Sequence, residues 1–204
     1  MKTLSFETKE EWLDARRGKI TGSKLKDIVV KRGTGKKIGF YQLIADRLGI
    51  PADDENPMER GIRLESEALQ TFAKETGKKI DTSLVIWTRE DNEDIAYSPD
   101  AFTLHKKIPT ECVETKCLAS ARHIEALLTQ QIPDEYEFQK LQAFIVNDDL
   151  QTLYFVFYDP RLLARPFFYL TIKRSELQAE IDQYLAYERD VLAEIDKIVL
   201  ELTF

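Results

Sequence analysis

Three segments in the middle of the chain have the composition of β-strands and follow one another with no helical pattern between them. They are KIDTSLVIWT (79–88), DIAYSPDAFTL (94–104) and ECVETKCL (111–118), with turns expected near residues 90–94 and 105–110. Two later segments, 152–160 and 166–174, are also rich in aromatic and β-branched residues. Helical patterns lie before, between and after the strands. This order predicts an α/β fold with a mixed central sheet flanked by helices.

The expected helices are identified by their end signals. They cover residues 8–18, 21–30, 40–50, 56–79, 120–130 and 134–147, and a long terminal helix follows residue 175. Thr8 and Glu11 have the spacing of a capping box, as do Ser175 and Gln178, and Asn56 can cap the helix that Pro57 opens. With 204 residues and 43% hydrophobic content, the chain suits a single domain over residues 1–204.

Charge is distributed unevenly along the chain. The formal net charge is -7, but between residues 16 and 37 there are nine basic residues and one acid, Asp27. From Ser175 onward there are eight acids and two bases. A basic segment in an otherwise acidic chain suits a protein that contacts a polyanion on one side only. The alternative is that the basic segment is a helix exposed to solvent with no such partner.

No apolar run approaches the length of a membrane span, and the N-terminal residues have no signal-peptide core. A cytoplasmic location without membrane contact is therefore expected. The two cysteines, Cys112 and Cys117, are separated by an odd number of positions, so on a strand they point to opposite faces. They are expected to be small buried residues and not a disulfide or a zinc pair.

An acid and an ammonium share one face of the segment CVETKC. Glu114 and Lys116 are two positions apart, and Val113 and Thr115 share the other face. Asp100 ends the preceding strand in YSPD, where proline interrupts regular pairing. Taken singly, these residues also fit a solvated strand face and a turn aspartate.

A further carboxylate lies on the helix expected at 56–79. Glu65 falls on the stripe formed by Met58, Ile62, Leu69 and Phe72, which is expected to face the core. A carboxylate in that position needs a partner, either a nearby arginine or a cation. If Glu65, Asp100 and Glu114 converge, they can hold Mg²⁺ for phosphodiester hydrolysis. Lys116 could then orient or deprotonate the attacking water, or neutralise developing charge.

An aspartate followed by E-x-K is the pattern of the PD-(D/E)XK nuclease superfamily, whose core is restriction-endonuclease-like. Over nearly its whole length the chain resembles the lambda-exonuclease (YqaJ-type viral recombinase) family, and within it the phage-type alkaline exonucleases. The resembling stretches are WLDARRGKITGS, GIRLESEA, SPDA, VETKC, YEFQKLQAF and YFVFYDPRL. The resemblance implies a processive 5′-to-3′ exonuclease for double-stranded DNA that works as a ring-shaped homotrimer.

The resemblance also assigns roles to residues of the active site. It implies that Asp100, Glu114, Glu65 and the carbonyl of Thr115 hold metal, with two Mg²⁺ ions per site and Mn²⁺ able to substitute. Lys116 matches the catalytic lysine. Tyr136 and Gln139, three apart on one helical face, match residues beside the active site. Leu141 stands where the family often has a second glutamine.

Further matches concern DNA. Arg16 and Ser23 match residues that grip the terminal 5′-phosphate, and Ser98 matches a serine near it. An anion is favoured near a helix start such as that expected at Ser23. The basic loop with Arg32, Lys36 and Lys37 resembles a loop that contacts duplex DNA. The implied partners are double-stranded DNA ends and a single-strand annealing protein, and the implied setting is the cytoplasm of a bacterial host, with a phage or prophage gene.

Two other functions remain open on the sequence. The first is an endonuclease on the same superfamily fold, which nicking of closed circular DNA would reveal. The second is a DNA-end-binding protein that has lost activity, which the complete set of Glu65, Asp100, Glu114 and Lys116 argues against.

Overall fold

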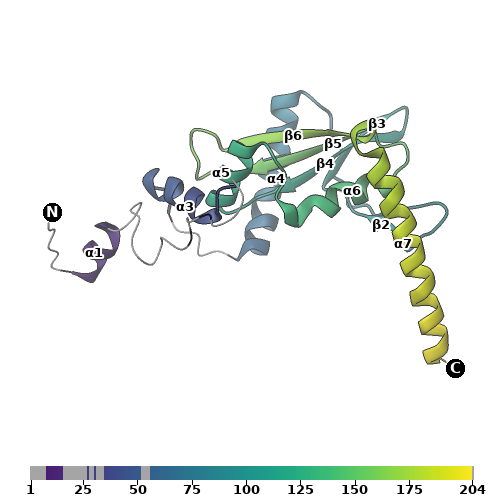
Figure 1. Cartoon of the computed structure of the whole chain (residues 1–204). Coiled ribbons are helices and arrows are strands. Elements are labelled where there is room, and N and C mark those ends of the chain that lie inside the picture. Colours follow the sequence, from purple (N-terminus) through teal and green to yellow (C-terminus); the bar gives the residue numbers. More distant parts are fainter. Residues whose placement is uncertain (1–7, 16–26, 28–29, 31–34, 52–55, 204) are drawn as a thin grey trace. The chain divides into compact units, whose positions relative to one another are not determined.

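The computed structural model describes residues 8–15, 27, 30, 35–51 and 56–203 (Figure 1). Most of the helix expected at 21–30, and the end of the helix expected at 8–18, lie outside these residues. The chain forms two compact units. Unit 1 comprises Met1–Leu64, Cys117–Gln131 and Phe157–Phe168, and unit 2 comprises Glu65–Lys116, Ile132–Val156 and Tyr169–Phe204.

The described elements follow the predicted order: helices, a run of strands, helices again, two strands and a terminal helix. In chain order they are α1 (Lys9–Ala15), α3 (Ile38–Arg47), α4 (Pro57–Thr76), β1 (Trp87–Thr88), β2 (Ala96–Tyr97), β3 (Ala101–His105), β4 (Ile108–Lys116), α5 (Ser120–Thr129), the 3₁₀ turn η1 (Asp134–Tyr136), α6 (Glu137–Val146), β5 (Thr152–Tyr158), β6 (Phe167–Lys173) and α7 (Arg174–Thr203). None of the helices in the described ranges is long and apolar enough to cross a membrane.

Strands β3 and β4 form an antiparallel hairpin in a four-stranded sheet of order β3-β4-β5-β6. Ala101 is opposite Val113, and the register shifts by a bulge between Thr103 and Leu104. The turn at Lys106 and Lys107 has φ angles of 51° and 72°. Two consecutive positive φ angles are typical of the tight hairpin turn whose twist matches that of the strands.

The other two pairings make the sheet mixed. The N–H of Gln151 donates to the carbonyl of Thr110 at 2.8 Å, so β5 begins beside the start of β4 and runs parallel to it. The N–H of Arg174 donates to the carbonyl of Gln151 at 3.1 Å, so β6 ends where β5 begins and is antiparallel to it. Parallel neighbours need a long crossover. Here the crossover from β4 to β5 carries α5, η1 and α6.

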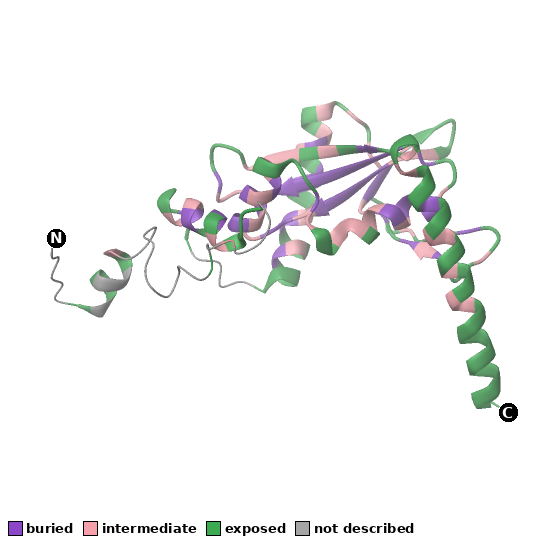
Figure 2. Ribbon diagram, in the orientation of Figure 1, coloured by how far each residue is buried: buried purple, intermediate pink, exposed green. Residues whose placement is uncertain are grey.

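The core of unit 2 is built on residues 152–156 of β5, a strand whose residues are all buried (Figure 2). A continuous apolar strand is expected where both faces of a sheet are covered. Phe72 of α4 is fully buried, and its ring centroid lies 5.2 Å from that of Tyr154 and 5.5 Å from that of Tyr169. Burying one such side chain contributes about 1.5–3 kcal/mol.

Unit 1 has its own small core, in which α3 packs against α5. Its buried members are Tyr41, Ala45, Ile50, Ala121, Ile124 and Leu162. Helix α5 begins at Ser120, whose hydroxyl donates to the buried carboxylate of Asp159 at 2.5 Å. Arg161 pairs with the same carboxylate at 2.8 Å. Cys117, like Cys112 in unit 2, is a buried thiol, as expected.

Two of the predicted helix starts are confirmed. Asn56 accepts a hydrogen bond from the N–H of Met58 at 2.9 Å. Thr8 and Glu11 exchange reciprocal bonds of 3.2 Å between side chain and backbone, as a capping box does. The third prediction is wrong, because α7 begins at Arg174 and so includes Ser175 in its first turn.

The predicted core-facing stripe of α4 is wrong in its first half. Met58 and Ile62 are 73% and 71% exposed, and the buried apolar positions of this helix are Leu64, Ala68, Leu69 and Phe72. The helix is therefore covered mainly in its second half.

The strand predicted over residues 79–88 is also largely wrong. Only Trp87 and Thr88 pair with β2, and Asp81 forms a single bridge to Phe102. Between them, Leu84 is fully exposed. The strand predicted over 94–104 is divided into β2 and β3 at Ser98–Asp100, where Pro99 removes a backbone donor.

Candidate active site

Glu114 is the most buried acid of the site, at 2% exposure in β4. Its Oε1 accepts hydrogen bonds from Lys116 Nζ at 2.6 Å and from Gln139 Nε2 at 2.5 Å. Its Oε2 accepts one from the hydroxyl of Tyr97 at 2.5 Å. Glu114 and Lys116 therefore do share one face of the strand. A buried carboxylate needs such donors, because leaving it unpaired is costly.

Asp100 lies immediately before β3, and its carboxylate binds Thr115 of β4. Its Oδ2 accepts from the N–H of Thr115 at 2.6 Å and from the Thr115 hydroxyl at 2.7 Å. The break at Pro99 thus turns the Asp100 carboxylate onto the strand that carries Glu114. The Asp100 carboxylate therefore binds the residue of β4 that directly follows Glu114.

The electrostatics link Glu65 to this pair. Burial raises the pKa of Glu65, and the negative charge of Asp100 raises it further, while the nearby Lys116 lowers it. Burial, followed by repulsion from Asp100, raises the pKa of Glu114 to about 7, against the opposing effect of Lys116. Three carboxylates therefore act on one another across a site that has a single ammonium group, that of Lys116, among the predicted residues.

Two aromatic side chains, one from the crossover and one from β5, lie beside the ammonium group of Lys116. The Nζ of Lys116 lies 4.8 Å from the ring centroid of Tyr136 in η1 and 5.8 Å from that of Phe155 in β5. Cation–π contact of this kind holds an ammonium against an apolar wall. Gln139, three residues after Tyr136, reaches Glu114 directly. Leu141 is 3% exposed and belongs to the core, which explains why an apolar residue is tolerated there.

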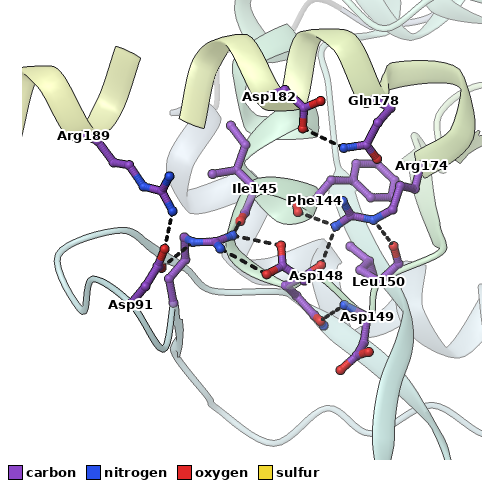
Figure 3. Close-up of polar contacts among 12 residues, drawn as sticks. Asp91, Phe144, Ile145, Asp148, Asp149, Leu150, Arg174, Gln178, Asp182 and Arg189 are labelled. Atoms are coloured by element: carbon purple, nitrogen blue, oxygen red, sulfur yellow. Dashed lines mark hydrogen bonds and ion pairs between the residues drawn. The ribbon is translucent and has the colours of Figure 1, made fainter. Parts of the chain in front are cut away.

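Two arginines fasten the C-terminal end of α6, the helix that carries Gln139 (Figure 3). Arg89 donates to the carbonyl of Ile145 and forms a two-bond pair with Asp148 at 2.9 and 3.0 Å. Arg174 donates to the carbonyls of Phe144 at 2.5 Å and Asn147 at 2.6 Å. The last carbonyls of a helix have no partner within it, and cations are favoured at this end. The two side chains therefore hold α6 in place.

Tyr97 was not found from the sequence. It is 6% exposed, and burial, followed by the charge of Glu114, raises its pKa well above the usual value, so its hydroxyl stays protonated and donates. The signal was available in principle. A tyrosine on a strand three residues before Asp100 needs a partner for its hydroxyl if it is buried.

The residues predicted to contact DNA are only partly described. Ser98 is exposed between β2 and β3, one residue before the proline that precedes Asp100. Lys36 and Lys37 are exposed just before α3, and Lys36 Nζ lies 5.4 Å from the ring centroid of Phe40. Arg16, Ser23 and Arg32 lie outside the described residues.

The predicted metal ligands fit a hard divalent cation by their chemistry. Carboxylate and carbonyl oxygens are the ligands that Mg²⁺ takes, usually one or two carboxylates with water completing the shell. The pKa values of Glu65 and Glu114 are raised first by burial and second by the negative charge of Asp100, and a bound cation would oppose both effects. In the part of the chain that the structure describes, no group of three or more acidic, histidine or cysteine side chains is arranged so that it could hold a metal ion.

The mixed sheet and its crossover helices are also found in known nucleases. An alkaline exonuclease from Laribacter hongkongensis, LHK-Exo, is 28% identical to this chain, and the match covers 95% of this chain and 98% of that one with a TM-score of 0.61. A second structure, of LHK-Exo in complex with dAMP, is 29% identical with the same coverage and a TM-score of 0.60. A search of curated protein sequences found no match.

These likenesses identify the fold as the restriction-endonuclease-like PD-(D/E)XK core, as the sequence predicted. The model of the YqaJ-like viral recombinase domain matches residues 11–148, which is more than half of the chain. The chain belongs to the YqaJ-like viral recombinase domain family.

Proposed function

We propose that this protein is a metal-dependent exonuclease that digests one strand of linear double-stranded DNA from a 5′-phosphorylated end. It works in the 5′-to-3′ direction, releases mononucleotides and leaves a 3′ single-stranded overhang. The family and the likeness to an alkaline exonuclease over 95% of the chain support this proposal. A structure of that exonuclease with dAMP, a mononucleotide, agrees with it.

The observation that carries the proposal is the set of contacts around Glu114. The buried carboxylate of Glu114 accepts hydrogen bonds from a lysine two residues later at 2.6 Å and from a glutamine of a crossover helix at 2.5 Å. A second carboxylate, Asp100, is bound to the residue between Glu114 and Lys116. A merely solvated strand face, the alternative reading of the sequence, does not explain this burial.

Asp100, Glu114, Glu65 and the Thr115 carbonyl would hold Mg²⁺, with two ions per site and Mn²⁺ able to substitute. When bound, the cation polarises a phosphodiester and lowers the pKa of a coordinated water. The protein itself supplies the ammonium of Lys116, which can orient the attacking water or neutralise charge on the phosphate. Gln139 and Tyr97 fix the position of the Glu114 carboxylate through their hydrogen bonds.

A pocket for a terminal phosphate turns a nuclease of this kind into an exonuclease, because alignment then depends on a chain end. We assign Arg16, Ser23 and Ser98 to the 5′-phosphate and Arg32, Lys36 and Lys37 to the duplex. Arginine suits the first role, since its planar fork can grip two phosphate oxygens. Contacts with the DNA backbone carry no base information, so low sequence specificity is expected.

The assembly that we propose is a ring-shaped homotrimer that holds the duplex in a basic channel. It acts in the cytoplasm of a bacterial host, encoded by a phage or prophage, and delivers the overhang to a single-strand annealing protein. Counterion release predicts that salt weakens DNA binding and shortens processive runs.

A time course on linear duplex with a single labelled 5′-phosphate tests the proposal. With Mg²⁺, the label should appear first as a mononucleotide, and EDTA should abolish its release. Closed circular duplex should remain intact under the same conditions. Nicking of the circle would indicate an endonuclease, and end binding without release would indicate an inactive end-binding protein; either result removes the proposal.

A further inference from the structure

Helix α7 has two halves that differ in how they are covered. In the first half Ile181 is 2% exposed, and the ring of Tyr184 packs edge-on against Phe138 of α6 with centroids 5.3 Å apart. From residue 193 onward, every described residue of the helix is exposed, and Figure 2 shows the ribbon of this end in the colour of exposed residues. The second half of α7 is therefore exposed to solvent all around the helix.

The apolar stripe that packs on α6 continues into this exposed half. Positions at alternating spacings of three and four along α7 are Ile181, Tyr184, Glu188, Val191, Ile195, Ile198 and Leu202. Ile195, Ile198 and Leu202 are 46%, 45% and 82% exposed. Such spacing is typical of a helix that pairs with another helix. Contiguous exposed apolar side chains mark an interaction surface.

A groove of about 470 Å³ lies at the point where the stripe leaves α6. Phe138 and Ile145 of α6 and Tyr184, Tyr187 and Glu188 of α7 contribute to its lining, which is mainly apolar. The Glu188 carboxylate interacts with the Gln142 side chain by a hydrogen bond and with the charge of Arg89. Its Oε2 atom is nevertheless buried without a hydrogen-bond partner among the described residues. A buried carboxylate oxygen without a donor is unfavourable, and a cation from a ligand would satisfy it.

The charges beside the stripe select the kind of partner. From residue 193 to residue 203, α7 carries the acids Glu194, Asp196 and Glu201 against the single base Lys197. This charge disfavours nucleic acid, an anionic membrane surface and side-by-side pairing with a second copy of α7. It favours a partner with basic residues beside its own apolar stripe.

Polar contacts attach the first half of α7 to the rest of unit 2 (Figure 3). Arg174 donates to the carbonyl of Leu150 at 2.8 Å, and Arg189 pairs with Asp91 in the β1–β2 connection. The exposed half continues directly from these anchors as regular helix. A surface held in its binding conformation loses less entropy when a ligand docks.

We propose that residues 191–202 of α7, with the adjoining groove, bind an amphipathic helix of a partner protein that has Lys or Arg flanking its apolar stripe. The apolar residues of the partner pack along Ile195, Ile198 and Leu202. One of its basic residues enters the groove and pairs with Glu188. This surface is separate from the residues assigned to DNA cleavage.

Designed peptides provide the probe. A fluorescent helical peptide of about three heptads has Leu at the apolar positions and Lys on the flanks. A second peptide has Glu in place of Lys, and a third has the Lys composition in scrambled order. Anisotropy titrations with the full chain at ~0.15 M salt should detect binding of the first peptide only.

Matched variants locate the binding. The double variant Ile198→Ser/Leu202→Ser should weaken binding of the Lys peptide by more than ~10-fold, and Glu188→Gln by ~3-fold or more. Leu200→Ser is the control, because Leu200 is 61% exposed on the opposite side of the same helix. This variant should bind the Lys peptide with the affinity of the parent. Ile198, Leu200 and Leu202 are exposed and Glu188→Gln keeps the size of the side chain, so all variants should keep the helical circular dichroism of the parent.

Three results would overturn the proposal: no binding, equal binding of the Glu or scrambled peptide, or equal weakening by Leu200→Ser. A fourth is a fall in the mass of the protein alone, by sedimentation, in the double variant, which would show that a second copy covers the stripe. Peptide binding is measured directly, so a failure of the proposed nuclease activity would leave this test unaffected.

Discussion

The hydroxyl of Tyr97 and the carboxylate of Glu114 are joined by a buried 2.5 Å hydrogen bond that links the two-stranded sheet to the four-stranded one. Tyr97 belongs to β2 and Glu114 to β4, so the bond connects two elements that have no backbone ladder in common. It also uses the carboxylate oxygen that Lys116 and Gln139 do not contact.

Replacing Tyr97 with Phe should therefore affect both stability and catalysis. Loss of a donor to a buried carboxylate should lower the free energy of unfolding by about 1–2 kcal/mol. The less constrained Glu114 should slow mononucleotide release, with DNA-end affinity unchanged. Chemical denaturation and initial rates measure the two effects. Tyr187→Phe, at a 64% exposed position, is the control and should change neither.

Removing the ammonium group of Lys116 or the carboxylate charge of Asp100 should abolish DNA cleavage without weakening DNA binding. Lys116→Met and Asp100→Asn are expected to bind duplex ends with the parental affinity and to lose cleavage by more than ~10³-fold, in line with loss of a group that acts on transition-state charge. Gel-shift titration and the labelled-end assay measure these properties. Mg²⁺-dependent release at the parental rate in either variant would contradict the assigned roles.

Arg89 is expected to be a main support of α6. Its side chain is 9% exposed, and Arg89→Met would leave the Ile145 carbonyl and Asp148 without their donor, which should reduce the free energy of unfolding by about 2 kcal/mol. Arg189→Met is a matched control. The Arg189 side chain is 49% exposed and pairs with Asp91, so its loss should have an effect of about 0.2–1 kcal/mol. Equal effects in urea unfolding would show that Arg89 has no special role.

The hairpin turn offers a stabilising change. Lys107 has a φ of 72°, which is unfavourable for a residue with a Cβ atom, whereas glycine adopts it readily. Lys107→Gly should raise the free energy of unfolding by about 0.5–1 kcal/mol. Lys74→Gly, at an exposed position within α4, should instead lower it by about 1 kcal/mol. A decrease at both positions would mean that the turn is not strained.

His123 should make stability depend on pH. Burial lowers its pKa below the usual 6.5, with Asp159 opposing and Arg161 adding to the effect. Its Nε2 contacts the Arg165 carbonyl at 3.0 Å, and its Nδ1 has no hydrogen-bond partner among the described residues. The fold thus favours the neutral ring. This stabilisation is complete above pH 6.5 and is lost as pH falls from there towards the lowered pKa.

The difference in unfolding free energy between the parent and His123→Gln isolates this contribution. It should be larger at pH 7.5 than at pH 5.5, because only the parent has a ring to protonate. Using the difference removes the opposite trend of Glu114, whose raised pKa favours the fold at lower pH. A difference that does not change with pH would contradict the prediction.

The features predicted best from the sequence are those that depend on near neighbours in the chain. The cap at Asn56, the break at Pro99 and the shared face of Glu114 and Lys116 follow from spacing alone, and the structure has all three. The exposed Met58 was predicted wrongly because periodicity gives an apolar side of a helix but not where its cover begins.

Features that depend on distant pairing were harder to predict. The segment from residue 79 to 86 has strand composition, but only Asp81 finds a backbone partner, on β3. Composition does not show whether a neighbouring edge is available. The bond from Tyr97 to Glu114 likewise joins residues 17 positions apart, and the local pattern indicates only that a buried Tyr97 hydroxyl needs a partner, not which residue provides it.

The bulge between Thr103 and Leu104 lies between the hairpin turn and the pairing of Ala101 with Val113. A change in turn length can be taken up there as an extra unpaired residue, on the far side from Asp100. Homologues and engineered versions can therefore lengthen, shorten or graft this tip while the acidic end keeps its alignment, which makes the tip a suitable place to insert a label or a tether.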